Sequence, residues 1–239
     1  MKLMVFDIET TGFLEDKNAV MTELAWVIWD TYGNRVINAE SLLIDSIRGE
    51  SDVEVPKLIT ELTGITAAML LEHGVSVEAV LNRFTLAAEG CHAYVTRNGW
   101  LFDWPFLKRE AARIDFLLHD LPLIDDRHDI PYPASKANTL SYVAADHGFL
   151  NPFPHSALGD AVTLMTVLQR GKYDMQAALE SAKSPLVEVR AHVSFEKKDL
   201  AKEAKFFWEP NRKLWLKHMR EAAAQKADFP FQFSIVGKL

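Results

Sequence analysis

The chain has very little cysteine and no long hydrophobic run. Its 239 residues include a single cysteine, Cys91, which excludes an internal disulfide framework and a zinc site made of cysteines. Cys91 lies in the apolar segment CHAYV, so we expect a buried, unreactive thiol. No segment approaches the roughly 18–20 apolar residues that a membrane-spanning helix needs, and the first residues, MKLMVFDIETTG, lack the pattern of a signal peptide. We therefore expect a reducing, cytoplasmic setting and no membrane partner.

Charge is distributed unevenly along the chain, although the net charge is only −7. Residues 183–239 contain 12 Lys+Arg and 7 Asp+Glu, a balance of +5. Residues 1–182 contain 14 Lys+Arg and 26 Asp+Glu, a balance of −12. An acidic body with a basic tail suits a metal-binding part joined to a part that meets polyanions. A basic surface that is merely solvated explains the tail equally well.

Alternating β-rich and helical segments predict an α/β fold. We expect strands at residues 2–8, 20–30, 35–44 and 91–95, with the second and third forming a hairpin around the turn TYGN. We expect helices at residues 75–90, 103–114, 139–148 and 156–169; the apolar positions of the first are Val77, Val80, Leu81, Phe84 and Leu86. This order predicts a mixed β-sheet flanked by helices.

The composition changes at residues 183–185, so we expect a first domain at 1–183 and a second at 184–239. In the second, residues 187–195 alternate as a strand, 196–207 have the pattern of a basic helix, and 213–219 have the pattern of a returning strand. The sequence therefore predicts a small α+β C-terminal module.

Asp7 and Glu9 end the first predicted strand. Residues two apart on a strand point to the same face, so both carboxylates aim at one place. Two like charges held this close raise each other's pKa unless a cation lies between them. Taken alone, such a pair is typical of a solvated strand end.

Further residues change that interpretation. Asp103 starts a predicted helix just after Asn98-Gly99, which follow a strand, and Asp160 lies on a helix five residues after His155. Four acids with a histidine nearby supply oxygen ligands for hard cations such as Mg²⁺ or Mn²⁺. The absence of a cysteine cluster and of a histidine pair at ligand spacing disfavours zinc. A plain surface histidine in the turn NPFPHS is the alternative for His155.

Three segments carry a resemblance to a known family. DIETTG (residues 7–12), NGWLFDWPFL (98–107) and HSALGDA (155–161) resemble, in this order, the three motifs of the DnaQ-like (DEDDh) superfamily of 3′–5′ exonucleases. The resemblance covers residues 3–170, and LTGIT (62–66) is similar to a further segment of these proteins. The spacing from His155 to Asp160 matches the histidine variant of the third motif. Arg97 stands where many members have histidine.

The resemblance implies an RNase H-like fold and hydrolysis with two metal ions. Asp7, Glu9, Asp103 and Asp160 would hold two Mg²⁺ (or Mn²⁺) ions, and His155 would be the general base. A histidine suits this role because its unperturbed pKa, roughly 6.5, lies near working pH. The products would be 5′-mononucleotides.

The residues around these acids are the expected substrate contacts. Small residues in a turn let a ligand approach the backbone, so we expect contacts from the turn residues and their neighbours, Thr10, Thr11, Gly12, Phe13 and Asn98. Phe13 or Leu14 could stack on the terminal base or wedge beside it. For Phe13, filling the edge of the sheet is an equally good interpretation. We expect the other acid cluster, Asp125, Asp126 and Asp129, to lie in a solvated loop.

Aromatic and basic residues alternate in the tail segment AKEAKFFWEPNRKLWLK. Such a pattern favours stacking on bases and neutralising phosphates, and the expected nucleic-acid contacts are Lys205, Arg212, Lys213 and Trp215. Alternatively, the tryptophans build the core that a small module needs. The segment is similar to C-terminal modules of phage-type exonucleases.

The leading hypothesis is a 3′–5′ exodeoxyribonuclease acting on single-stranded DNA. The alternatives are an exoribonuclease similar to RNase T, a polymerase-associated proofreading subunit with the tail as docking element, and a non-catalytic nucleic-acid binder. The expected partners are single-stranded nucleic acid, DNA favoured over RNA, and a DNA polymerase or another replication protein. The expected setting is a bacterial or phage-infected cytoplasm.

Overall fold

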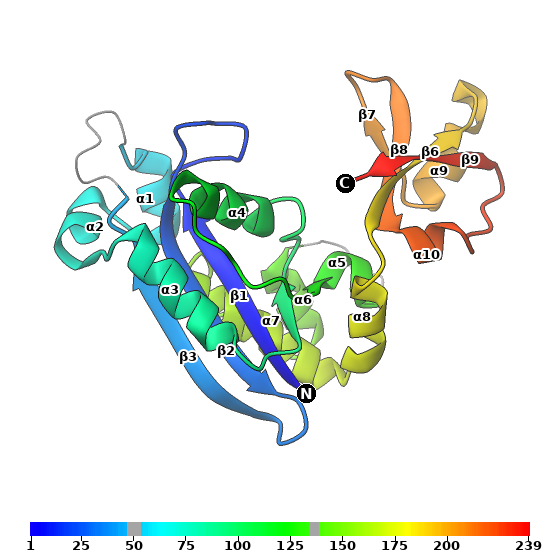
Figure 1. Ribbon diagram of the computed structural model, residues 1–239. Helices are drawn as coiled ribbons and strands as arrows, with labels where there is room; N and C mark the ends of the chain where they lie inside the picture. The colour runs from blue at the N-terminus through cyan, green and yellow to red at the C-terminus, as the bar shows by residue number, and fades with distance from the viewer. Residues whose placement is uncertain (47–53, 134–138) are drawn as a thin grey trace. The chain divides into compact units, whose positions relative to one another are not determined.

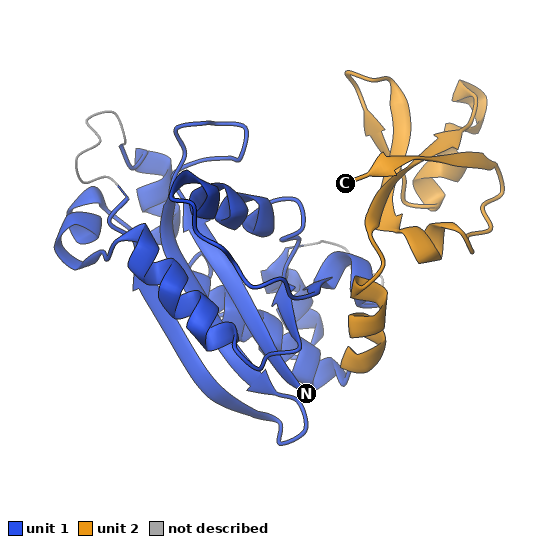
Figure 2. Ribbon diagram, viewed as in Figure 1, with its two compact units in different colours: residues 1–174 blue, residues 175–239 orange. Residues whose placement is uncertain are grey.

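A computed structural model describes residues 1–46, 54–133 and 139–239 and divides the chain into two compact units, residues 1–174 and 175–239 (Figure 2). The units divide at the start of helix α8 (Met175–Ala182). The composition of the sequence predicts two domains with the limits 1–183 and 184–239, and these limits stay a prediction. Every helix in the described ranges is too short or too polar to cross a bilayer.

The first unit contains a mixed sheet, as the sequence predicts, but it has five strands, and the short strand at Leu123–Asp125 was not predicted. Its strands are β1 (Lys2–Thr10), β2 (Met21–Asp30), β3 (Arg35–Leu43), β4 (Ala93–Thr96) and β5 (Leu123–Asp125), in the order β3-β2-β1-β4-β5. The pairs β1–β2 and β2–β3 are antiparallel, whereas β4 runs parallel to β1 and β5 parallel to β4. The predicted hairpin at residues 20–44 is thus confirmed.

Helices cover both faces of this sheet. The helices of the first unit are α1 (Lys57–Thr63), α2 (Ala67–His73), α3 (Val77–Ala88), α4 (Asp103–Arg113), α5 (Asp126–Asp129), α6 (Leu140–Asp146) and α7 (Ala157–Gly171). Helices α3 and α4 lie on one face, and α7 packs against β1 and β2 on the other (Figure 1). The sequence predicts α3, α4, α6 and α7, but it misses the short helices α1, α2 and α5.

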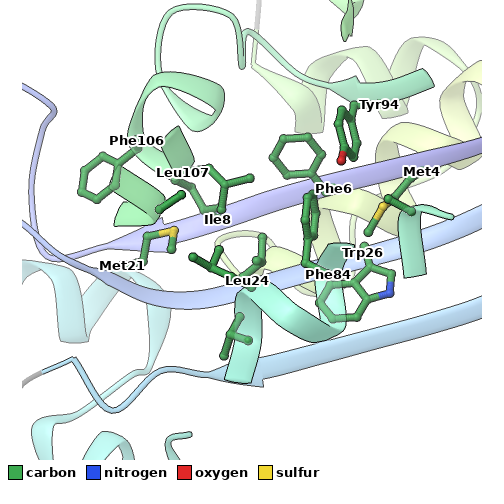
Figure 3. Close-up of a cluster of buried hydrophobic side chains, with 14 of the residues drawn as sticks. Met4, Phe6, Ile8, Met21, Leu24, Trp26, Phe84, Tyr94, Phe106 and Leu107 are labelled. Atoms are coloured by element: carbon green, nitrogen blue, oxygen red, sulfur yellow. The ribbon is translucent and has the colours of Figure 1, made fainter. Parts of the chain in front are cut away.

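An aromatic core fills the space between the sheet and α3. Phe6 of β1 and Phe84 of α3 meet edge to face with ring centroids 5.3 Å apart, and Phe84 stacks on Tyr94 at 5.4 Å (Figure 3). Such pairs add about 0.5–1.5 kcal/mol to what burial alone contributes. Leu86, one of the apolar positions of the expected helix, is 66% exposed, because it projects from another side of the helix than Phe84. Cys91 is buried and free, as expected.

The second unit is built around a four-stranded antiparallel sheet with the order β7-β8-β6-β9. After α8, its elements are β6 (Leu186–His192), a 3₁₀ turn (Phe195–Lys197), α9 (Lys198–Glu203), β7 (Phe207–Glu209), β8 (Leu214–Arg220), α10 (Glu221–Ala224) and β9 (Gln232–Lys238). The predicted α+β module is confirmed. The basic helix is shorter than expected, because it ends at Glu203 and Lys205 adopts a left-handed conformation with φ +61°.

Candidate active site

The alternation of β1 separates its acids from its core residues. Phe6 and Ile8 face the aromatic core, so Asp7 and Glu9 project from the opposite face, where α7 packs. Asp160 lies in the first turn of α7. Asp7, Glu9 and Asp160 each offer a carboxylate oxygen, and these three atoms lie within 4.8 Å of one another. The structure therefore brings together three of the four predicted metal ligands at one point.

The fourth predicted ligand, Asp103, lies outside this group of three acids but contacts the same strand. It is the first residue of α4 and only 4% exposed, and its Oδ1 accepts a hydrogen bond from the backbone N–H of Ile8 at 3.3 Å. This bond ties Asp103 to the strand between Asp7 and Glu9. Its charge contributes to raising the pKa of Asp7, as expected for carboxylates held close together.

His155 is held next to Asp160 by its backbone. Its N–H donates to Asp160 Oδ2 at 3.3 Å, its φ is +62°, and its side chain is exposed. Asn151, which the sequence analysis misses, donates from Nδ2 to Asp160 Oδ1 and accepts the N–H of Phe153 at 3.0 Å. The segment that carries His155 thus folds back onto Asp160.

Gly159 allows this segment to lie against α7. A Cβ at this position would lie 2.3 Å from the backbone oxygen of Phe153, which is closer than atoms can approach. The glycine within the motif HSALGDA is therefore required by the close approach of the segment that carries His155, directly before the predicted metal ligand Asp160.

Glu23 is a fifth acid at the site that the sequence analysis did not identify. It lies on β2 directly opposite Glu9 and is 7% exposed. Its Oε2 accepts the N–H of Ala157 at 3.0 Å, and Ser41 donates to its Oε1. Ser156 makes no side-chain cap at α7, so Glu23 satisfies one of the free N–H groups that start the helix. An acid inside the buried strand MTELAWVIWD is the signal that could have revealed it.

The carboxylates of the cluster are protonated more readily than usual. Burial, followed by the charges of the other acids, raises the pKa of Asp7 well above its usual range. Burial and then Glu23 raise the pKa of Glu9 to about 8, and burial raises the pKa of Asp103 to about 7. Burial also raises the pKa of Asp160. A buried, mutually repelling set of oxygen donors fits a hard divalent cation.

The expectation that Asp125, Asp126 and Asp129 lie in a solvated loop is wrong. The first two are fully buried and the third is 9% exposed. Asp125 accepts the N–H of Trp100 at 3.0 Å, and Asp126 accepts the N–H of Asn98 at 3.3 Å. These acids are buried because they satisfy backbone N–H groups of the segment that leads to Asp103.

Arg97 pairs with one of these acids. Its Nη1 contacts Asp126 Oδ2, and Tyr132 donates its hydroxyl to the same oxygen at 3.1 Å. Burial raises the pKa of Asp126 to about 6, although the charge of Arg97 opposes this effect. Burial raises the pKa of Asp160, and the charge of Arg97 opposes this rise, after the larger opposing effects of Asn151 and His155. Arg97 therefore has a buried partner, and its charge also acts on Asp160.

The predicted substrate residues lie in the turn after β1 and in the segment before α4. Thr10 donates to the carbonyl of Gly12 at 2.7 Å, and Thr11 Oγ1 accepts the N–H of Val20, so both threonines are buried in shaping the turn. Phe13 is 76% exposed, which excludes the interpretation that it fills the sheet edge. Asn98, which has φ +55°, accepts a hydrogen bond from the Arg127 guanidinium at 3.1 Å.

The four predicted contacts in the tail differ in environment. Lys205 and Lys213 are exposed. Trp215 packs against the hydrophobic core of the second unit. Arg212 forms two hydrogen bonds, of 2.7 and 2.8 Å, to the buried carboxylate of Glu188.

Known protein families match both units. The exonuclease family (RNase_T) matches residues 4–168, and a domain of unknown function (DUF8626) matches residues 187–235. The PolC-type DNA polymerase III of Mycoplasma pneumoniae is 32% identical over 122 residues, which are 51% of this chain and 8% of the polymerase. The corresponding polymerase of Mycoplasma genitalium shows the same identity and coverage. The chain thus spans a small part of the length of these relatives.

Solved structures share the fold of the first unit. The nuclease domain of 3′hExo, a DEDDh family member bound to rAMP, has a TM-score of 0.60 at 16% identity and covers 75% of this chain and 94% of its own. Exonuclease I of E. coli in complex with a dA16 oligonucleotide has a TM-score of 0.60 at 15% identity, over 80% of this chain and 48% of its own. The family match extends over more than half of the sequence and includes the three clustered acids and Asp103. The chain therefore belongs to the exonuclease family, within the DnaQ-like (DEDDh) superfamily of metal-dependent 3′–5′ exonucleases.

Proposed function

We propose that the chain is a 3′–5′ exodeoxyribonuclease that removes 5′-mononucleotides from the 3′ ends of single-stranded DNA. The observation that carries the proposal is the convergence of Asp7, Glu9 and Asp160 within 4.8 Å, with Asp103 tied to the same strand. A non-catalytic binder is disfavoured, because burying several acids together is costly and serves no purpose without a cation.

The four acids would hold two Mg²⁺ or Mn²⁺ ions. All their donor atoms are carboxylate oxygens. Burial and mutual repulsion raise the pKa values of Asp7 and Glu9, and a bound cation would relieve that repulsion. When bound, such ions supply Lewis acidity, which activates water and stabilises the departing 3′ oxygen. The protein contributes the rigid placement of these acids on β1, α4 and α7.

His155 is the proposed general base. Its ring is solvent-accessible, and its backbone is fixed to Asp160 by the N–H bond, so the imidazole stays beside the metal ligands. There it accepts the proton of the attacking water. Asn151 and Gly159 are positioning residues, because they hold the His155 segment against α7.

The turn after β1 is the proposed binding place of the terminal nucleotide. The buried hydroxyls of Thr10 and Thr11 fix the turn, so the backbone of Gly12 is open to the sugar-phosphate and Phe13 projects into solvent. Phe13 stacks on the terminal base. Asn98 contributes a polar side chain from the segment before Asp103.

Two alternatives have support from the similar proteins. The fold is shared with E. coli exonuclease I in complex with DNA and with the DEDDh nuclease bound to rAMP, so an exoribonuclease is the second candidate. The PolC-type polymerases favour a third candidate, a proofreading nuclease that acts beside a DNA polymerase.

The sugar preference is tested by competition. Single strands of DNA and RNA with one sequence, each with a different 5′ label, are mixed and incubated with the protein and Mg²⁺, then with Mn²⁺. We expect DNA to be shortened faster under both ions. Faster shortening of RNA would make the chain an exoribonuclease, and stimulation only on addition of a DNA polymerase would favour the proofreading candidate.

A further inference from the structure

Trp208 and Trp215 form a ring pair on one face of the second unit's sheet. The register of β7 and β8 places them directly opposite each other, and directly opposite residues share a face. Their ring centroids lie 5.5 Å apart with the planes tilted by 57°. Trp215 packs against the core, whereas Trp208 remains 46% exposed. The ring of Trp208 is thus held by its contact with Trp215 and remains partly exposed to solvent.

One lysine lies on the same face of the sheet, and a second lies beside it. Lys217 is two residues after Trp215 on β8, so it shares that face. Its Nζ donates to the carbonyl of Ala204 at 2.9 Å and lies 5.3 Å from the ring centre of Phe229. This bond brings it beside the exposed Lys205. Burial, and then the charge of Lys205, lowers the pKa of Lys217, which agrees with two ammonium groups being close together.

No carboxylate pairs with either lysine in the described part of the chain, whereas two other basic groups of the unit have such partners. Arg212 is bound to Glu188, and Lys202 to Asp199. Residues 175–239 contain 12 Lys+Arg and 8 Asp+Glu, so the unit carries excess positive charge. The charges of Lys205 and Lys217 are part of this excess, and they lie near the exposed ring of Trp208.

We propose that Lys205, Trp208 and Lys217, here named the Trp208 surface, bind single-stranded nucleic acid. A base stacks on Trp208, and the two ammonium groups neutralise the adjoining phosphates. This assignment rests on the proposed function, because the strand bound is the substrate of the nuclease. It gives a role to the part of the chain that matches a domain of unknown function. Compared with the sequence prediction, Trp208 replaces Trp215, and Arg212 becomes a structural residue.

The test measures binding separately from hydrolysis. The full chain is titrated, in EDTA and at several salt concentrations, into a fluorescently labelled single strand longer than the roughly 4–16 nucleotides that such surfaces cover. Trp208→Ala should weaken binding about fivefold or more, and Trp208→Phe should restore most of the affinity. Lys205→Ala should lower the slope of log affinity against log salt by about 0.7.

Matched controls come from the same unit. Phe195 is an exposed aromatic residue beside a lysine, and Lys226 is an exposed lysine on another segment, so Phe195→Ala and Lys226→Ala should bind as the parent does. Lys205→Glu guards against a misfolded Trp208 variant, because an exposed charge reversal leaves the core intact.

Parent-like affinity in both Trp208→Ala and Lys205→Glu would overturn the proposal, and a protein partner would then be the occupant to seek. Equal losses in the controls would overturn it as well. A chain that hydrolyses no strand but binds one through Trp208 would contradict the proposed exonuclease function. It would still support the proposal that the Trp208 surface binds single-stranded nucleic acid.

Discussion

Glu9 and Glu23 lie directly opposite each other on β1 and β2. Glu9 belongs to the group of acids that can hold a metal, whereas both oxygens of Glu23 accept hydrogen bonds, from Ala157 and Ser41. Two adjacent glutamates therefore have different surroundings: one belongs to the candidate metal-binding group, and the other attaches α7 and its Asp160 to the sheet.

Replacing Glu23 should affect stability more than metal chemistry. Glu23→Ala leaves the buried N–H of Ala157 without its acceptor, so we expect a loss of about 1–3 kcal/mol in the free energy of unfolding. Urea denaturation measures this loss. Glu9→Ala is the matched variant: it should abolish metal binding in calorimetric titration with little loss of stability. A Glu23→Ala protein of parental stability that no longer binds Mn²⁺ would reverse the two assignments.

The metal-free protein should become less stable as the pH rises. The folded-state pKa of Glu9 is raised from its ordinary 4.5 to about 8, so between these values the folded state binds more protons than the unfolded state. Stability then falls with rising pH across this window. The raised pKa of Asp7 acts in the same direction.

Thermal melts in EDTA and in excess Mg²⁺, recorded across this pH range, measure the effect. The melting temperature should fall with pH in EDTA, and Mg²⁺ should raise it most at the alkaline end, because the cation binds the ionised acids. An equal Mg²⁺ effect at both ends of the range would show that these acids do not bind the ion.

Gly159→Ala should damage catalysis without removing any functional group. The added Cβ meets the backbone of Phe153, so the segment that carries His155 must move, at a cost of about 1–3 kcal/mol in stability. We expect a fall in kcat with little change in metal affinity. Gly237→Ala is the control, because a Cβ there meets nothing within 4 Å. Full activity in Gly159→Ala would show that the placement of His155 is unimportant.

His155→Ala should slow hydrolysis by about 10²–10⁴-fold, which is the usual contribution of a general base. Metal affinity should persist, because the oxygen ligands remain. Single-turnover assays at saturating Mg²⁺ separate the two effects. Turnover at the parental rate would mean that another group takes the proton.

Much of the site was predictable because its signals are local in sequence. The period of two along β1 places Asp7 and Glu9 on one face, and the spacing of His155 and Asp160 lies within one segment. Glu23 was missed because its meaning depends on cross-strand register, which sets its partner Glu9 and its bond to Ala157.

The wrong prediction for Asp125 and Asp126 also arises from contacts between residues that are distant in sequence. Asp125 and Asp126 resemble loop acids in sequence, yet they are buried because N–H groups more than twenty residues earlier in the chain need acceptors. The choice between Trp208 and Trp215 likewise depends on which ring the core covers, and composition cannot reveal that.

The central claim is that the acids of β1, α4 and α7 hold the metal that drives 3′–5′ hydrolysis. The most direct measurement follows a 5′-labelled DNA single strand in Mg²⁺, with the parent chain and with Asp7→Asn, which keeps the shape of the side chain but removes its charge. We predict a ladder shortened from the 3′ end by the parent, and no shortening by Asp7→Asn or by the parent in EDTA. Shortening by Asp7→Asn at the parental rate, or by the parent in EDTA, would contradict the claim.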